Sequence, residues 1–125
     1  MTSAPNLAKQ DLSHVNLAKT NMAGADLHAA NLRDATLTDT NFEGADLTDT
    51  DLANADLGGA SLRNASAAHA NLEGADLRDA DLAGTNLRGA HMNGAKLRDA
   101  DRAIAELAGA NFTERVAQEA PTSDR

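Results

Sequence analysis

The sequence predicts an all-β fold, a quadrilateral β-helix of about five and a half coils, with a short helix at its C-terminal end. Three observations predict this fold. Residues 5–114 form 22 consecutive blocks of five residues without an insertion or deletion. Nearly every block has a large apolar residue at its centre, and most blocks end in a residue that favours turns.

The third position of each block is its apolar centre. Leucine fills 16 of the 22 centres, and these are all the leucines of the chain; Met22, Met92, Phe42 and Phe112 fill four more. A helix would scatter these residues around its axis, because five residues advance by about 140° at 3.6 residues per turn. One continuous strand is excluded too, because its side chains alternate faces every two residues and five is odd. Each block is therefore predicted to be a short strand, with positions one and three inward, followed by a turn.

The fifth position of each block is predicted to form a corner. Gly, Asn or Asp occupies it in 15 of the 22 blocks, and these residues tolerate the positive φ of tight turns. A right-angle turn every five residues closes a square in four blocks, so a coil has about 20 residues and stacks on the next at about 4.8 Å. Block centres that lie four blocks apart then share an interior column.

The recurring motif A(D/N)LxX, seen at Ala25-Asp26-Leu27, Ala45-Asp46-Leu47 and Ala75-Asp76-Leu77, resembles the pentapeptide repeat proteins. The resemblance covers about 88% of the chain. It implies a right-handed quadrilateral β-helix, in which each coil contacts only its neighbours.

Three regions are predicted along the chain: an N-terminal tail at 1–4, the repeat β-helix at 5–112, and a cap helix with a disordered tail at 113–125. The helix is expected from Asn111 onward, because Asn111 and Glu114 suit a capping box and Pro121 would end it.

Two block centres depart from the pattern, Ala67 and Arg102. Ala67 would leave a void in its column unless its neighbours fill it. Arg102 stands where a leucine belongs, so it either reaches solvent over its stem or pairs with an acid such as Asp101 or Glu106. These features predict an atypical C-terminal end. The resemblance implies that this end could form a homodimer, as it does in some family members, and a monomeric cap is the alternative; the candidate residues are Arg102, Ile104, Phe112 and Val116.

Composition argues against several classes of function. The net charge of −8 disfavours direct binding to nucleic acids or to anionic membranes, and the absence of Cys excludes disulfides and cysteine-ligated metals. The four histidines (His14, His28, His69 and His91) show no metal-ligand spacing. We therefore expect a cytoplasmic protein that is not an enzyme and has no catalytic residues, no cofactor and no metal site.

The acids between Arg33 and Arg63 form a negative stretch, here called the acidic belt, that contains no base. Its members are Asp34, Asp39, Glu43, Asp46, Asp49, Asp51 and Asp56. The most negative face of the square is predicted to carry Asp11, Asp34, Asp51, Glu73 and Glu114 against Arg33.

Two hypotheses of function follow. The chain is either a scaffold that binds an unidentified protein through its flat faces, or a DNA mimic. The second is implied by the resemblance, because some family members resemble duplex DNA in shape and charge, bind DNA gyrase and protect it from quinolones.

Overall fold

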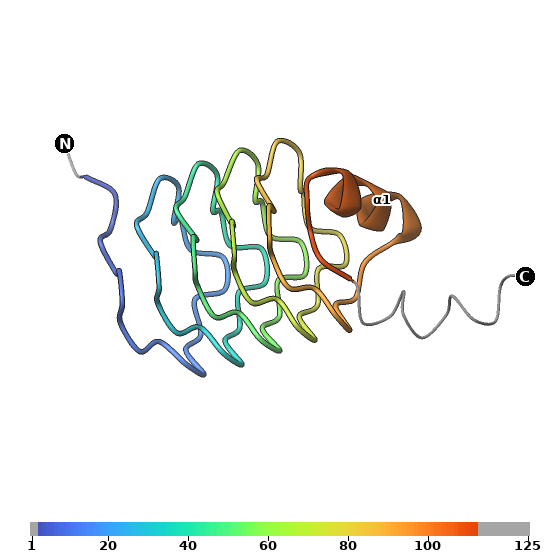
Figure 1. Cartoon of the computed structure of the whole chain (residues 1–125). Coiled ribbons are helices and arrows are strands. Elements are labelled where there is room, and N and C mark those ends of the chain that lie inside the picture. The colour runs from blue at the N-terminus through green and yellow to red at the C-terminus, as the bar shows by residue number, and fades with distance from the viewer. Residues whose placement is uncertain (1–2, 113–125) are drawn as a thin grey trace, which may run out of the picture.

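The backbone forms a stack of four-sided coils. A computed structural model describes residues 3–112, and within them the chain winds as a right-handed quadrilateral β-helix (Figure 1). Each of the 16 described bridges is parallel and joins second-position residues that lie 20 residues apart, from Asn6 with Asp26 to His91 with Asn111. The predicted fold class and the predicted length of a coil are both confirmed.

Backbone hydrogen bonds join each coil to the next. The amide of Leu27 donates to the carbonyl of Asp46 at 2.8 Å, and the amide of Asp46 donates to the carbonyl of Ala25 at 2.9 Å. The same pair of bonds recurs on every side, so an interior coil has its amides and carbonyls paired in both directions along the axis.

The corners are β-turns whose third residue has a positive φ. Every fifth position from Lys9 to Gly94 has a φ between 57° and 75°. In the turn after Leu27, the amide of Ala30 donates to the Leu27 carbonyl at 3.0 Å. This is the conformation that Gly, Asn and Asp adopt most readily, which explains their enrichment at the fifth position.

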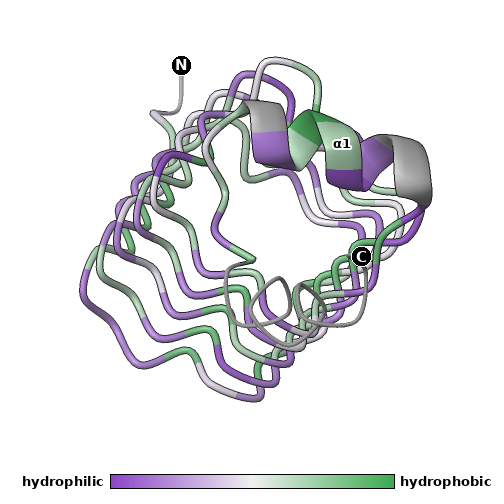
Figure 2. Ribbon diagram, turned by 45° about the vertical axis from the view of Figure 1, so that its right-hand side comes forward, coloured by the Kyte–Doolittle hydropathy of each residue, from purple (hydrophilic) through white to green (hydrophobic). Residues whose placement is uncertain are grey.

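The interior is one continuous hydrophobic core of block centres and first-position alanines. Viewed obliquely along the axis, the stacked coils superimpose as a square frame around it (Figure 2). Phe42 is completely buried, as are Leu47 and Leu57. Ala67 is 1% exposed, in the column between Leu47 and the equally buried Leu87.

Buried threonines at first positions are satisfied by backbone carbonyls of the preceding coil. The hydroxyl of Thr50 donates to the Leu27 carbonyl at 2.8 Å, and that of Thr85 donates to the Leu62 carbonyl at 2.6 Å. These bonds explain how a polar side chain can replace alanine inside the core.

The β-helix is interrupted by helix α1 (Asp99–Leu107), which lies along one side of the frame at the C-terminal end (Figures 1 and 2). The repeat β-helix predicted for residues 5–112 is wrong for this segment, which forms a helix. Ile104 would occupy a corner there, and a β-branched residue adopts a positive φ only with strain. The segment DADRAIAEL is also rich in good helix formers.

The chain returns to the coil after α1 in the original register. The amides of Gly109 and Ala110 donate to the carbonyls of Glu106 and Ala105, at 3.1 and 3.0 Å, in a Schellman arrangement with Gly109 at φ 97°. Asn111 then pairs with His91, so it is part of the coil and does not begin the predicted helix. The remainder of that helix, and the tail at 113–125, lie outside the described residues.

Candidate functional site: the charged sides of the solenoid

The structure distributes the acidic belt around the whole coil. We name the four sides after the centres of the second coil: the Leu27, Leu32, Leu37 and Phe42 sides. The belt residues are Asp46 and Asp49 on the Leu27 side, Asp34 and Asp51 on the Leu32 side, Asp39 and Asp56 on the Leu37 side, and Glu43 on the Phe42 side. The belt is therefore a ring, and one flat partner surface could not contact all of it.

Three belt acids hold the backbone of their own block. Asp46, Asp51 and Asp56 occupy second positions, and each Oδ1 accepts the amide two residues later, at 3.0, 3.1 and 3.0 Å. Second-position Asn and Asp side chains therefore stabilise the turn that follows them.

Three further belt acids occupy corners. Asp34, Asp39 and Asp49 have φ values of 61°, 57° and 60°. Aspartate is one of the few residues that adopts this conformation readily. Six of the seven belt residues thus have a local backbone role, and Glu43 has none of this kind.

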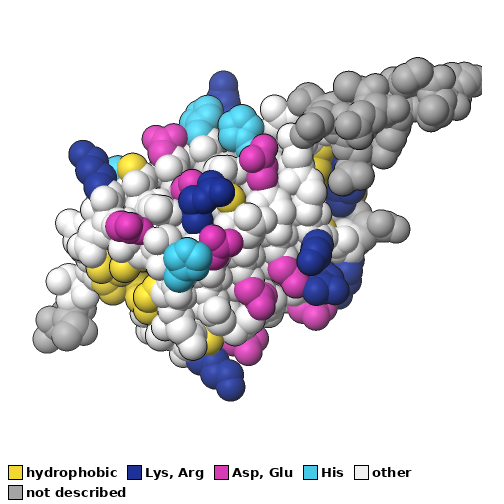
Figure 3. Space-filling view, turned by 90° about the horizontal axis from the view of Figure 1, so that it is seen from below, with side chains coloured by type: hydrophobic (Ala, Val, Ile, Leu, Met, Phe, Trp, Pro, Cys, Tyr) yellow, Lys and Arg dark blue, Asp and Glu magenta, His cyan; other side chains and the backbone are white. Residues whose placement is uncertain are grey.

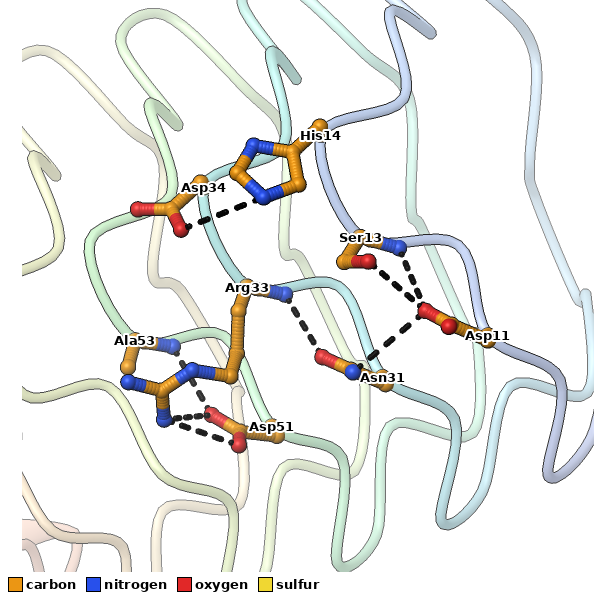
Figure 4. Close-up of polar contacts among 8 residues, drawn as sticks. All are labelled: Asp11, Ser13, His14, Asn31, Arg33, Asp34, Asp51 and Ala53. Atoms are coloured by element: carbon orange, nitrogen blue, oxygen red, sulfur yellow. Dashed lines mark hydrogen bonds and ion pairs between the residues drawn. The ribbon is translucent and has the colours of Figure 1, made fainter.

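The Leu32 side contains a set of acids that contact neighbouring polar side chains and backbone amides (Figure 4). Asp11 Oδ1 accepts the Ser13 hydroxyl at 2.7 Å and the Asn31 amide group at 3.4 Å. The hydrogen bond from Ser13 lowers the pKa of Asp11 below its usual value. Arg33 Nη1 lies 3.1 Å from Asp51 Oδ2, and this contact raises the pKa of Arg33.

Among the described residues, the Leu32 side carries four acids against Arg33 alone. We call these four residues the acidic side: Asp11, Asp34, Asp51 and Glu73. Asp34 lies 3.7 Å from His14 Nε2, a contact that is ionic only when the imidazole is protonated. Glu114, the fifth predicted acid of this face, lies outside the described residues.

The other sides mix acids with arginines. Arg63 Nη1 lies 3.1 Å from Asp81 Oδ2 on the Phe42 side. On the Leu37 side, Arg78 donates to both oxygens of Asp76, at 2.9 and 2.6 Å, and these bonds lower the pKa of Asp76 to about 2. A space-filling view likewise shows acids interspersed with bases and histidines, and apolar side chains gathered at the N-terminal end (Figure 3).

The predicted C-terminal interface is largely occupied by contacts within the chain. The Arg102 guanidinium lies 4.1 Å from the centroid of the Phe112 ring, and its Nε lies 3.4 Å from Glu106 Oε2. Phe112 is only 4% exposed, whereas Ile104 is 46% exposed. Val116 lies outside the described residues.

A shallow hollow of about 230 Å³ lies beside the first coil and is formed by Ser3, Ala4, Pro5, Asn21 and Ala23. It contains no carboxylate, imidazole or other group suited to general acid–base chemistry. No helix in the described part of the chain is long and apolar enough to cross a membrane.

A comparison of the sequence with models of known protein families identifies the five-residue repeat. The model for pentapeptide repeats matches eight copies, over residues 11–49, 45–82, 68–101 and 75–113. The chain belongs to the pentapeptide repeat family. No curated protein sequence matches it significantly.

Three crystal structures of pentapeptide repeat proteins resemble this one. A protein from the cyanobacterium Cyanothece 51142 is 31% identical with a TM-score of 0.73; the match covers 74% of this chain and 64% of that one. A protein from the Arabidopsis thaliana thylakoid lumen is 32% identical over 87% of this chain and 81% of its own, with a TM-score of 0.63. HetL from Nostoc sp. strain PCC 7120, a protein involved in heterocyst differentiation regulation, is 30% identical over 72% and 48%, with a TM-score of 0.62.

The pentapeptide-repeat geometry brings together one group that sequence reasoning missed. Ligand atoms of Asp26, His28 and Asp46 all lie within 4.8 Å of one another, so these residues could hold a metal ion. Spacing along the chain hides the group, because Asp46 follows Asp26 by one whole coil. A search that combined neighbours within a block with residues one coil further along the chain would have found it.

Proposed function

We propose that this pentapeptide repeat protein is a non-catalytic interaction module that binds a basic surface of a protein partner through its acidic side. The supporting observation is the uneven charge of the rod. The acidic side has four acids against Arg33, whereas the opposite Phe42 side has Glu43 and Asp81 against Arg63 among the described residues.

The column of bridged second-position residues, here called the second-position ladder, makes the acidic side a preorganised surface. Asp11, Asn31, Asp51 and Asn71 follow one another as bridged second-position residues, at about the 4.8 Å spacing of adjacent strands. A partner with lysines or arginines along a groove would meet charges whose positions are already fixed, so binding would require little ordering of this chain.

The proposal is tested with a triple substitution that removes three charges and preserves shape: Asp11→Asn, Asp34→Asn and Glu73→Gln. The matched control, Asp39→Asn, Glu43→Gln and Asp49→Asn, removes the same charge from the other three sides. Affinity capture from a lysate of the native host is quantified by mass spectrometry at low and high salt. We expect a stoichiometric partner that the native chain and the control retain, and that the acidic-side triple and high salt release. Equal capture by both triples would refute the role of the acidic side.

DNA mimicry directed at DNA gyrase is the second candidate, and it draws support from the ring arrangement of the acidic belt. Charge density weighs against it. Five and a half coils at about 4.8 Å each span about 26 Å, and a DNA duplex of that length carries roughly 15 negative charges. This chain has a net charge of −8. The measurement is gyrase supercoiling, with and without a quinolone, in the presence of the native chain or of the triple Asp46→Asn, Asp49→Asn and Asp51→Asn. An effect of the native chain that the triple loses would favour mimicry over the scaffold.

A further inference from the structure

Acids in the second-position ladder generally have a neutral or cationic neighbour on the next coil or beside them. On the Leu32 side, the Asn31 amide group donates to Asp11 Oδ1 and the Asn71 amide group donates to Asp51 Oδ1, both at 3.4 Å. The alternation of acid and amide keeps two carboxylates from stacking directly in that column.

Two described ladder steps stack an acid directly on an acid: Asp26 with Asp46, and Asp56 with Asp76. The second step is offset by Arg78, which binds both oxygens of Asp76. No described Lys or Arg forms an ion pair with Asp26 or Asp46. Two carboxylates at strand spacing without a fixed cation repel each other, so this step favours a bound positive charge.

The imidazole of His28 faces the same step. His28 Nδ1 lies 2.6 Å from Asp26 Oδ1, and both side chains are 40% exposed, so an ion can reach them from solvent. Backbone bonds fix the two coils, because the amide of Leu27 donates to the Asp46 carbonyl at 2.8 Å and the amide of Ala29 donates to the Thr48 carbonyl at 2.9 Å.

We propose that Asp26, His28 and Asp46 bind a divalent first-row transition metal ion, with Zn²⁺ as the favoured ion, and that the ion links the second coil to the third. One imidazole nitrogen and two carboxylate oxygens are ligands that Zn²⁺ accepts, at about 2.0–2.2 Å. Ligand atoms around a tetrahedral Zn²⁺ ion lie about 3.4 Å apart. The three ligand atoms here lie within 4.8 Å of one another, so ion binding would draw them together by rotation of their half-exposed side chains.

The metal ion would take the place of the proton between His28 Nδ1 and Asp26 Oδ1, and this proton would be released to solvent. Three protein ligands leave further positions to water. Mg²⁺ and Ca²⁺ should bind more weakly, since they prefer oxygen ligands and this group offers a nitrogen.

The test uses untagged chain in a buffer that does not bind metals. Zn²⁺ affinity and stoichiometry are measured by calorimetry, and Co²⁺ is added as a visible-absorbance probe of coordination. The variants are His28→Ala and Asp46→Asn, both compared with the native chain by circular dichroism before metal is added. The matched control is His14→Ala. His14 Nε2 also lies near an aspartate, 3.7 Å from Asp34, but these two residues are not part of a three-ligand group among the described residues.

We expect one Zn²⁺ per chain, with the affinity at least about tenfold weaker in His28→Ala and Asp46→Asn and unchanged in His14→Ala. Added Zn²⁺ should raise the thermal midpoint of the native chain and of the control only, because an ion that binds only the folded chain stabilises it. Absence of saturable Zn²⁺ and Co²⁺ binding, unchanged affinity in either variant, or an equal loss in His14→Ala would overturn the proposal. Asparagine occurs at many second positions of this repeat, so Asp46→Asn is expected to fold.

Discussion

Substituting Gly109 by alanine tests how the chain rejoins the coil after α1. Gly109 has a φ of 97°, and a Cβ at this residue would lie 3.0 Å from the Cα of Arg88, which is backbone and cannot rotate away. Gly44 is the matched control: its φ is 69°, and a Cβ there would have nothing within 4 Å. Both variants incur the left-handed conformation, about 1–2 kcal/mol, and Gly109→Ala adds about 1–3 kcal/mol of overpacking.

Hydrogen exchange gives the local measurement, since the chain has no Trp or Tyr to report by fluorescence. The amides of Gly89 and Met92 donate to the carbonyls of Gly109 and Asn111, at 2.9 and 3.1 Å. We expect Gly109→Ala to speed exchange at these two amides and to lower the urea midpoint more than Gly44→Ala does. If both variants lose the same stability while Gly89 and Met92 stay protected, the described return of the chain to the coil is wrong.

Three further predictions concern the core and the ladder. Leu57→Ala should destabilise the fold by about 2–5 kcal/mol in urea unfolding followed by circular dichroism, because Leu57 is fully buried; a cost below about 1 kcal/mol would contradict a close-packed column. Thr50→Val should cost about 1 kcal/mol, since it removes the bond to the Leu27 carbonyl and keeps the volume; no change would mean that this bond contributes nothing. The low folded-state pKa of Asp76, about 2 against 3.8, stabilises the fold above pH 3.8, and this contribution is lost as the pH falls towards 2. This contribution amounts to at most about 2 kcal/mol, because Arg78 is largely exposed and water screens the contact. In Asp76→Asn, this loss should be absent when the free energy of unfolding is measured as a function of pH.

The sequence was sufficient to predict the square coil because one physical constraint recurs in every block. The centre must be buried and the fifth residue must adopt a positive φ, and both constraints leave a visible residue preference. The helix was missed because its signals were weak alone: Ile104 at a corner and Arg102 at a centre indicated a break, but they did not indicate what would replace the coil. The C-terminal end of α1 is fixed where Gly109 and Asn111 pair with Gly89 and His91 of the preceding coil. These contacts between coils are not visible in the local sequence.

The candidate surfaces were less predictable than the fold. The acidic belt is continuous in sequence, yet one coil spreads it over four sides, since neighbouring blocks face different directions. The group of Asp26, His28 and Asp46 shows the converse, because two residues one coil apart become neighbours. Charge patterns in such a chain have to be read down the columns, from each coil to the next.

The constant offset of one coil between bridged residues has a mechanical consequence. Because each coil is bonded only to the coils on either side, a force applied along the axis would open the stack one coil at a time. A coil of about 20 residues extends to about 70 Å when pulled straight, but it occupies only about 4.8 Å of the axis while folded. Every rupture of an interior coil should therefore release nearly the same length, about 65 Å, so that pulling on the protein would produce a ladder of evenly spaced steps.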